Sequence, residues 1–436
     1  MKSRIAKLLD GSLVFIKHNI WAGLITLIKA FAQLILLKYT ALQLGQSGIG
    51  IFGQAFSVIV VLFAISNGGI TNTFITSVPS LRIGSEAHRR LLAVTGLWGL
   101  TAAVLLSLIC WLFGDRLATR LFSDSQFQIF FYIIPVALLV FSTQAISQGT
   151  LSAQREVKKI FFCHLVGLLF GVIGYCLCVS RFGELGIGIG AVVFYFSQAV
   201  VFSLYYLFER KDDFVALMPR WHKIEFNTLL GFSVVMLVTG SLGMCYQVFL
   251  RTYLNSVLGM SWSDIGDWQA LLKLSEISMS FIGVTISTSY LPTLSGIYDS
   301  DEVRTFVEKY ALKFFALIFF SCAILIALAP IVLHVVYSKD FVKLAPLMRW
   351  QICGDLFRLG SWLFTYFFLA KLSLRFFVVF EVGTLIVLSI LSLAFSHQWG
   401  VPGLIAAHVA TSISCLGVSY LLFKKFSLNS KSWRVK

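Results

Sequence analysis

Charged side chains inside long apolar runs are the residues of this chain that could do chemistry. In the stretch ICGDLFRLGSW, residues 352–362, Asp355 and Arg358 lie three positions apart. Together with Gln351 and Trp362 they follow the spacing of one helical face. A charge at the centre of a membrane helix costs about 2.5–3.5 kcal/mol on insertion scales, so it normally meets a partner or a watery cavity. The stretch therefore predicts a paired charge or a binding site.

Two further apolar stretches, 267–294 and 20–42, carry polar side chains at helical spacing. These are Gln269, Lys273, Glu276 and Ser280 in the first and Lys29 and Gln33 in the second. One interpretation is structural: Lys273 pairs with Glu276, and Asp355 with Arg358, only to hold helices together. The other is that the polar faces line an aqueous cavity between two helical bundles. The two are compatible, because a paired arginine can exchange its carboxylate for a substrate anion.

Bases without an acidic neighbour on their own predicted helix favour an anionic cargo. They are Lys29, Lys38, Arg251 and Arg349. Guanidinium groups bind phosphate through paired hydrogen bonds, so a cationic cavity suits a phosphate-bearing substrate. The candidate substrate-binding residues are Lys29, Lys38, Arg251, Lys273, Arg349 and Arg358. The candidate ion-coupling or gating residues are Glu276, Asp355 and Glu381.

The elements that must position these residues are membrane helices. Hydrophobic residues make up 58% of the 436 residues and charged residues 13%, and the mean hydropathy is +0.86. A soluble fold could not bury so much apolar surface. Runs of the roughly 20 residues that a spanning helix needs occur near 20–42, 49–78, 91–113, 128–151, 160–180, 186–208, 228–254, 267–294, 310–336, 347–370, 376–396 and 402–423.

These twelve spans predict an all-α polytopic membrane protein with two six-helix lobes around a central cavity. The N-terminal lobe covers 1–208, a cytoplasmic linker 209–226, and the C-terminal lobe with its tail 227–436. A repeat supports the duplication, because IGIFGQ at 49–54 resembles IGDWQ at 265–269. The helices that these segments open close with VPSL and LPTL. Lobes related by such a parallel repeat have their substrate site between them.

Lysine and arginine concentrate at the two termini and in every second loop. The intervening loops hold only Arg116, Arg120, Arg181, Lys339 and Lys343. The positive-inside rule therefore places both termini in the cytoplasm. The net charge of +15 is then explained by anionic membrane lipids as partners, without nucleic acid.

Motifs for nucleotide hydrolysis and metal catalysis do not occur in the sequence. There is no G-x-x-x-x-G-K-[ST] loop and no H-E-x-x-H, and the seven histidines have no metal-ligand spacing. We therefore expect no cofactor and no metal, and a transporter rather than an enzyme. Without a nucleotide site, a proton or sodium gradient is the expected driving force.

Several segments resemble the Wzx-type polysaccharide flippases. They are SWSDIGDWQALLKLSEISMSF followed by YLPTLS, WQICGDLFRLGSWLFTYFFLAKLSLRFFVVFEV, LMPRW at 217–221 and LLKYTALQLGQSGIGIFGQ at 36–54. The likeness runs along nearly the whole chain and is dense near 262–296 and 347–383. In the eighth span the acidic residue is Glu276 rather than Asp, a departure from the family that keeps the charge.

The resemblance implies a fold of the multidrug/oligosaccharidyl-lipid/polysaccharide exporter superfamily. It also implies a cargo, an undecaprenyl-pyrophosphate-linked oligosaccharide such as lipid III of enterobacterial common antigen or an O-antigen unit. The cargo would be turned from the cytoplasmic to the periplasmic leaflet by alternating access. A glycan polymerase and a chain-length regulator are the implied protein partners.

Other transporter classes fit the sequence less well. An ion-coupled multidrug exporter of the same superfamily is the main alternative, and it predicts an acidic cavity for cationic drugs. A peptidoglycan precursor flippase has more spans than this chain. A major facilitator carrier would have a G-x-x-x-D-x-x-G-[RK] element, where this chain reads PSLRIGSEAHRR. A structural partner of a glycan polymerase would explain the basic loops but not the charged helix faces.

Overall fold

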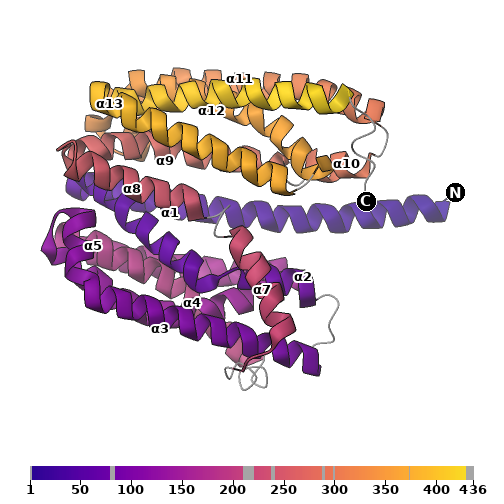
Figure 1. The fold of residues 1–436 in the computed structure, drawn as a ribbon, viewed down its shortest axis with the longest axis horizontal. Coiled ribbons are helices and arrows are strands. Elements are labelled where there is room, and N and C mark those ends of the chain that lie inside the picture. The colour runs from indigo at the N-terminus through magenta and orange to yellow at the C-terminus, as the bar shows by residue number, and fades with distance from the viewer. Residues whose placement is uncertain are drawn as a thin grey trace. The chain divides into compact units, whose positions relative to one another are not determined.

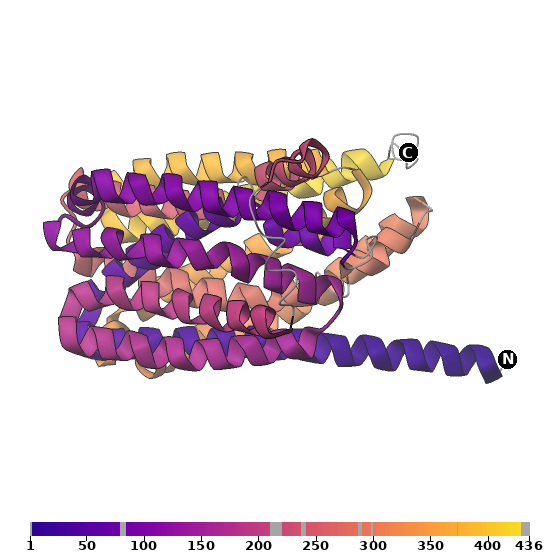
Figure 2. The same cartoon turned by 90° about the horizontal axis from the view of Figure 1, so that it is seen from below.

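A computed structural model describes residues 2–78, 84–209, 220–236, 241–286, 290–297, 300–372 and 374–428. Within those ranges every regular element is helical, and Figures 1 and 2 show no strand among them. The predicted all-α fold class is therefore confirmed. Most of the predicted linker 209–226, and the tail from 429 onward, lie outside the described residues.

The helices follow one another with short connections. They are α1 (Lys2–Asn67), α2 (Ile70–Ser77), α3 (Glu86–Phe122), α4 (Gln128–Ala153), α5 (Val157–Glu209), α7 (Lys223–Met236), α8 (Leu242–Ser256), α9 (Trp262–Thr285), α10 (Leu291–Gly296), α11 (Ser300–Val336), α12 (Ala345–Phe367) and α13 (Leu374–Leu428). The 3₁₀ segments Ser125–Phe127 and Lys339–Leu344 and the π segment Phe368–Leu372 lie between them.

Three of these elements, α1, α5 and α13, each contain two predicted spans. The spans are separated by a glycine with non-helical dihedrals: Gly45 (φ 64°), Gly183 (φ 58°) and Gly400 (φ 60°). A side chain in this region of φ/ψ is strained, so glycine is what permits the break. Three other predicted spans are split instead, into the end of α1 with α2, α7 with α8, and α9 with α10. The twelve predicted spans thus map onto the observed helices.

Within the described residues, six helices are long and apolar enough to cross a membrane. They are Gly23–Asn67, Glu86–Phe122, Ser125–Ala153, Val157–Glu209, Glu302–Val336 and Phe376–Phe426. Large apolar side chains such as Trp111, Phe170 and Phe320 are exposed on three of them. Exposed apolar surface of this kind suits contact with lipid rather than water. The chain is a multi-pass membrane protein.

The structure divides into two compact units. The first contains Met1–Leu44 and Ile51–Thr252, and the second contains Gly45–Gly50 and Tyr253–Lys436. Helix α7, and α8 as far as Thr252, belong to the first unit here, whereas the sequence assigns both helices to the C-terminal lobe. Compactness does not decide which helices move together, so the predicted lobe boundaries stay a prediction.

Glycines set the closest helix contacts within each unit. In the first unit, a Cβ atom on Gly99 would lie 2.4 Å from Cβ of Ser142. In the second, a Cβ atom on Gly360 would lie 2.3 Å from the ring of Phe315. Small residues let membrane helices approach closely, where apolar burial alone provides little driving force. Such contacts hold the helix faces that carry the site in register.

Candidate functional site

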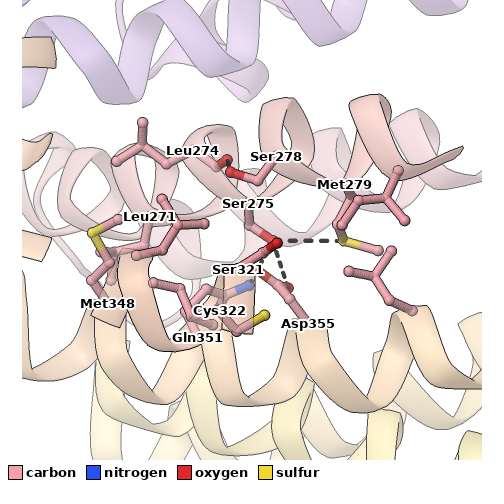
Figure 3. A pocket seen from close by; sticks show the side chains of 14 residues that line it. Leu271, Leu274, Ser275, Ser278, Met279, Ser321, Cys322, Met348, Gln351 and Asp355 are labelled. Atoms are coloured by element: carbon pink, nitrogen blue, oxygen red, sulfur yellow. Dashed lines mark hydrogen bonds between the residues drawn. The ribbon is translucent and has the colours of Figure 1, made fainter. Parts of the chain in front are cut away.

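Asp355 is the centre of a hydrogen-bond network in the second unit. It lies on α12 and is only 4% exposed. Its Oδ1 accepts a hydrogen bond of 2.6 Å from the Ser275 hydroxyl of α9 and lies 2.9 Å from Nε2 of His408 on α13. Gln351, one turn earlier on α12, donates to the same Ser275 hydroxyl at 3.3 Å. Figure 3 shows Ser275 and Asp355 pointing toward one another, so three helices converge on one carboxylate.

Local sequence explains how these helices meet. Gly354 directly precedes Asp355, and a Cβ atom there would lie 2.5 Å from the His408 ring. Only glycine lets α13 bring this imidazole so close to α12. Helix α9 begins with a capping box, because Ser261 and Asp264 each bond the other's backbone N–H. This cap fixes the start of the helix that carries Ser275.

A cavity of about 280 Å³ lies beside this network and is lined by α9, α11 and α12. Its walls are largely apolar, with Leu271, Leu325 and Leu359 among them. The polar groups are gathered at Ser275 and Asp355 (Figure 3). A cavity of this size has room for several water molecules, which need polar partners of this kind. The buried Asp355 carboxylate therefore lies beside a space that water could occupy.

Arg358 does not pair with Asp355, so that predicted ion pair is wrong. Its Nη2 lies 2.7 Å from Oε2 of Glu381 on α13, while Asp355 bonds Ser275 and His408 instead. The two residues share one helical face, but each finds a partner on a neighbouring helix. The second guanidinium nitrogen, Nη1, is buried and has no hydrogen-bond partner in the part of the chain that the structure describes. That atom keeps a donor available.

The predicted pair of Lys273 and Glu276 on α9 is confirmed. The ammonium lies 3.0 Å from Oε2 of Glu276, and the side chains are 17% and 30% exposed. Two of the three candidate coupling carboxylates, Glu276 and Glu381, are therefore held in ion pairs with a base. Asp355 differs, because its partners are a hydroxyl and an imidazole.

Arg251, in the first unit, is a fully buried residue of α8. It donates to the hydroxyl of Ser57 at 3.0 Å and to Oε1 of Gln247 at 2.9 Å. With 0% exposure, its guanidinium ties α8 to α1. Next to it, Gln54 bonds the Thr252 hydroxyl at 3.0 Å. These bonds cross-link α8 to α1, and the cargo-binding role that the sequence predicts for Arg251 stays a prediction.

The remaining candidates, Lys29, Lys38 and Arg349, lie in different settings. Lys29 and Lys38 are partly exposed on α1, and Arg349 is exposed near the start of α12. Lys29 and Arg349 make no hydrogen bond or ion pair with the side chains that the structure describes. Lys29, Lys38 and Arg251 belong to the first unit, and the other six predicted residues belong to the second. Among the predicted residues of the second unit, the structure shows the Asp355 network and the two ion pairs Lys273–Glu276 and Arg358–Glu381.

Ser275 and His408 are functional candidates that the sequence interpretation missed. His408 is visible in the sequence as a lone imidazole in the apolar run 402–423. Its partner lies on another helix, so no spacing rule identifies it. Among the described residues, no group of three or more His, Cys, Asp or Glu side chains is placed to hold a metal ion.

Comparison with known proteins places this geometry in context. A family model described as "Polysaccharide biosynthesis protein" matches residues 44–346, more than half of the chain. A protein of Escherichia coli (strain K12) named lipid III flippase is 24% identical over 414 residues, which cover 94% of this chain and 99% of that protein. A protein of the same name from Shigella flexneri matches equally well. These matches confirm the resemblance seen in the sequence.

Solved structures of transporters show the same fold. An inward-facing multidrug resistance MATE family transporter of the MOP superfamily aligns with a TM-score of 0.79 and 12% identity, over 92% of this chain and 94% of that one. The lipid II flippase MurJ, in an inward closed conformation, aligns with a TM-score of 0.71 and 14% identity, over 95% of this chain and 90% of that one. At such identities the likeness establishes the fold alone.

Proposed function

The chain belongs to the polysaccharide biosynthesis protein family, and from this membership we propose that it is a flippase for lipid-linked oligosaccharide. Its cargo would be an undecaprenyl-pyrophosphate-linked unit, lipid III of enterobacterial common antigen or an O-antigen unit. The chain would turn this cargo from the cytoplasmic to the periplasmic leaflet of the inner membrane, with both termini cytoplasmic. A glycan polymerase and a chain-length regulator would receive the product.

One observation carries this proposal: the first seven predicted spans contain bases but no acid. Lys29, Lys38 and Arg251 lie within them, and no Asp or Glu does. Arg251 is committed to Ser57 and Gln247, whereas Lys29 pairs with no described acidic side chain. A cation kept in a membrane helix without a countercharge is expensive. A pyrophosphate group would supply the missing charge.

Arg358 would be a second contact for the cargo. Its pair with Glu381 holds the guanidinium while the cargo is absent, and the buried Nη1 keeps a free donor. Phosphate binds arginine through two parallel hydrogen bonds, so it would compete with the carboxylate for the same group. The gate predicted between Asp355 and Arg358 is thereby replaced by one between Arg358 and Glu381.

Ion coupling is assigned in this proposal to Asp355. Glu276 and Glu381 are neutralised by Lys273 and Arg358, so a proton or sodium ion would have to compete with a fixed base. Asp355 instead meets Ser275 and His408 beside a cavity that water could enter. Protonation of Asp355, or binding of sodium there, would reset the carrier after release of the cargo.

A multidrug exporter is the second candidate, because a MATE transporter shares the fold. That alternative needs acidic groups to receive cationic drugs, and the first seven spans offer none. In the later spans Lys343, Lys273 and Arg358 hold Asp267, Glu276 and Glu381, and Asp355 lies against His408. The charge pattern therefore favours an anionic cargo.

Reconstitution tests the proposal directly. Purified protein is placed in liposomes that carry a fluorescent polyprenyl-pyrophosphate glycan in both leaflets. Accessibility to an external quencher or glycosidase is then followed with and without proton or sodium gradients. We expect protein-dependent movement that Arg358→Ala abolishes. Gradient-driven export of organic cations, with no movement of any glycan lipid, would establish the exporter instead.

A further inference from the structure

A buried histidine in the first unit has no hydrogen bond. His164, on the first half of α5, is 2% exposed, and neither ring nitrogen has a partner among the described residues. A buried polar group without a partner destabilises the fold, because it loses its bonds to water and gains none. A phenylalanine ring would fill a similar space without that cost. The position therefore carries a polar ring for a reason other than packing.

Helix α1 and the first half of α5 run parallel, with a nearly constant offset in sequence. Near their cytoplasmic ends, the rings of Trp21 and Phe161 meet edge-on at 5.1 Å. Further along, the hydroxyls of Thr40 and Tyr175, which are 135 residues apart, bond at 2.7 Å. These two contacts bracket the middle of both helices and fix their register.

Lys29 lies opposite His164 in this register. Their sequence separation equals that of the bonded pair farther along, and Ile25, one turn before Lys29, packs against the cluster that contains Ile160 and Cys163. The charge of the Lys29 ammonium also acts electrostatically on the His164 ring. Lys29 is partly exposed and makes no hydrogen bond or ion pair with any side chain that the structure describes. A lone ammonium thus lies beside an imidazole with no hydrogen-bond partner.

The His164 ring is held in place by the rest of α5. The Phe202 ring packs edge-on against it at 4.8 Å. A Cβ atom on Gly167 would lie 2.7 Å from Cα of Gln198, so the two halves of α5 are in close contact just beyond His164. The Gln198 amide nitrogen donates to the carbonyl of Phe194 at 3.2 Å. The Gln198 side chain is the polar neighbour of the imidazole, but no hydrogen bond of good geometry joins the two. The two halves of α5 therefore hold the His164 ring in place but give its nitrogens no hydrogen bond.

We propose that Lys29 and His164 together bind a phosphoryl oxygen of the cargo, with Lys29 supplying charge and His164 a ring N–H. The inference rests on the proposed function, and it names the residues of the first unit that would contact the anionic group of the cargo. A neutral imidazole carries one N–H donor, and an ammonium carries three. Hydrogen bonds to a charged oxygen are the strong ones, and water is scarce at this site. A bound phosphoryl group would satisfy both side chains at once.

Variants of His164 separate binding from folding. The full-length protein in detergent is titrated with undecaprenyl pyrophosphate and, separately, with undecaprenol, which has the same tail and no phosphate. Binding is followed by intrinsic tryptophan fluorescence, and Tm is measured for each variant. We expect His164→Phe to weaken pyrophosphate binding about tenfold, or 1.4 kcal/mol, with a Tm no lower than that of the native chain. Binding of undecaprenol should not change.

Two further variants complete the design. His164→Asn keeps an N–H donor and should bind within about threefold of the native chain, which also covers the case in which His164→Phe fails to fold. His397→Phe, at an exposed histidine of α13, is the matched control and should bind as the native chain does.

The outcomes separate this site from the proposed function. Suppose that the native chain prefers pyrophosphate, but His164→Phe binds it as tightly as the native chain does, or His164→Asn binds it more than about threefold more weakly. The site is then wrong, and the flippase proposal stands. If the native chain does not distinguish pyrophosphate from the alcohol, the proposed function fails, and this site fails with it.

Discussion

The ion pair between Arg358 and Glu381 gives the sharpest energetic prediction. Its atoms are 2.7 Å apart, and the side chains are 17% and 29% exposed. With charge centres near 4 Å, the gross attraction is about 4 kcal/mol at an effective dielectric of 20. Desolvation of two partly buried ions offsets part of this attraction. We therefore expect a net coupling of about 2–3 kcal/mol, well above that of an exposed pair.

A double-mutant cycle measures this coupling. Glu381→Leu should lower the free energy of unfolding by about 3 kcal/mol, because it leaves the Arg358 guanidinium without its carboxylate, and Nη1 of that group already lacks a partner among the described residues. Arg358→Leu should cost less, since a lone Glu381 can reach water more easily. The double variant should recover most of the loss, because no charge remains to be stranded. Unfolding in mixed micelles, followed by tryptophan fluorescence as denaturing detergent is added, reports each free energy of unfolding.

An exposed pair in the same unit is the matched control. Arg304 and Glu308 lie four residues apart on α11, with a distance of 2.9 Å and exposures of 46% and 56%. The same cycle there should give about 0.3–0.5 kcal/mol. Equal couplings for the two pairs would refute the argument, because burial would then add nothing to the interaction of Arg358 with Glu381.

In transport assays, Glu381→Gln should tighten cargo binding by removing the competitor for the guanidinium.

Three other predictions follow from single residues. Arg251→Met should lower the free energy of unfolding by about 2–4 kcal/mol, because buried partners lose a charged donor, while cargo affinity measured on the folded fraction stays unchanged. Gly183→Ala should lower the free energy of unfolding by about 1–3 kcal/mol, because the alanine side chain is strained at φ 58°. Gly231→Ala is the control, since Gly231 lies in helix α7 with open space around it. This control should leave the melting temperature unchanged or raise it. Asp355→Asn should remove the dependence of transport on the ion gradient in the liposome assay, and persistent gradient dependence would move the coupling site elsewhere.

Apolar runs predict the helices of this fold well, because a spanning helix must satisfy its backbone internally and be apolar along its length. The same runs do not show where a helix is interrupted. At 49–78 the break falls at Gly68 and Gly69, both with positive φ, inside one apolar run. The helical breaks at Gly45 and Gly183 are equally hard to see, since other glycines of these helices are ordinary helical residues. Dihedral angles are set by packing, and a single sequence does not report them.

In the candidate site, the sequence predicts contacts between residues of one helix but not contacts between residues of different helices. Spacing predicts the pair of Lys273 and Glu276 correctly, because both residues are on α9. Spacing fails for Asp355, whose partners come from α9 and α13. A polar face identifies which residues need a partner. Only the contacts between helices decide which partner each receives.

Acidic and basic residues are distributed differently in the earlier and the later predicted spans, and this difference suggests different roles for the two sets of spans. In the later spans Asp267 pairs with Lys343, Glu276 with Lys273 and Glu381 with Arg358, whereas Asp355 meets the Ser275 hydroxyl and the His408 imidazole. The earlier spans contain no acid, so Lys29 has no internal countercharge. A carboxylate held by a hydroxyl and an imidazole can exchange ions more readily than one held by a fixed base, whereas a base without a countercharge is stabilised by a ligand of opposite sign. On this argument the later spans are suited to sense an ion gradient, and the earlier spans to hold the anionic cargo.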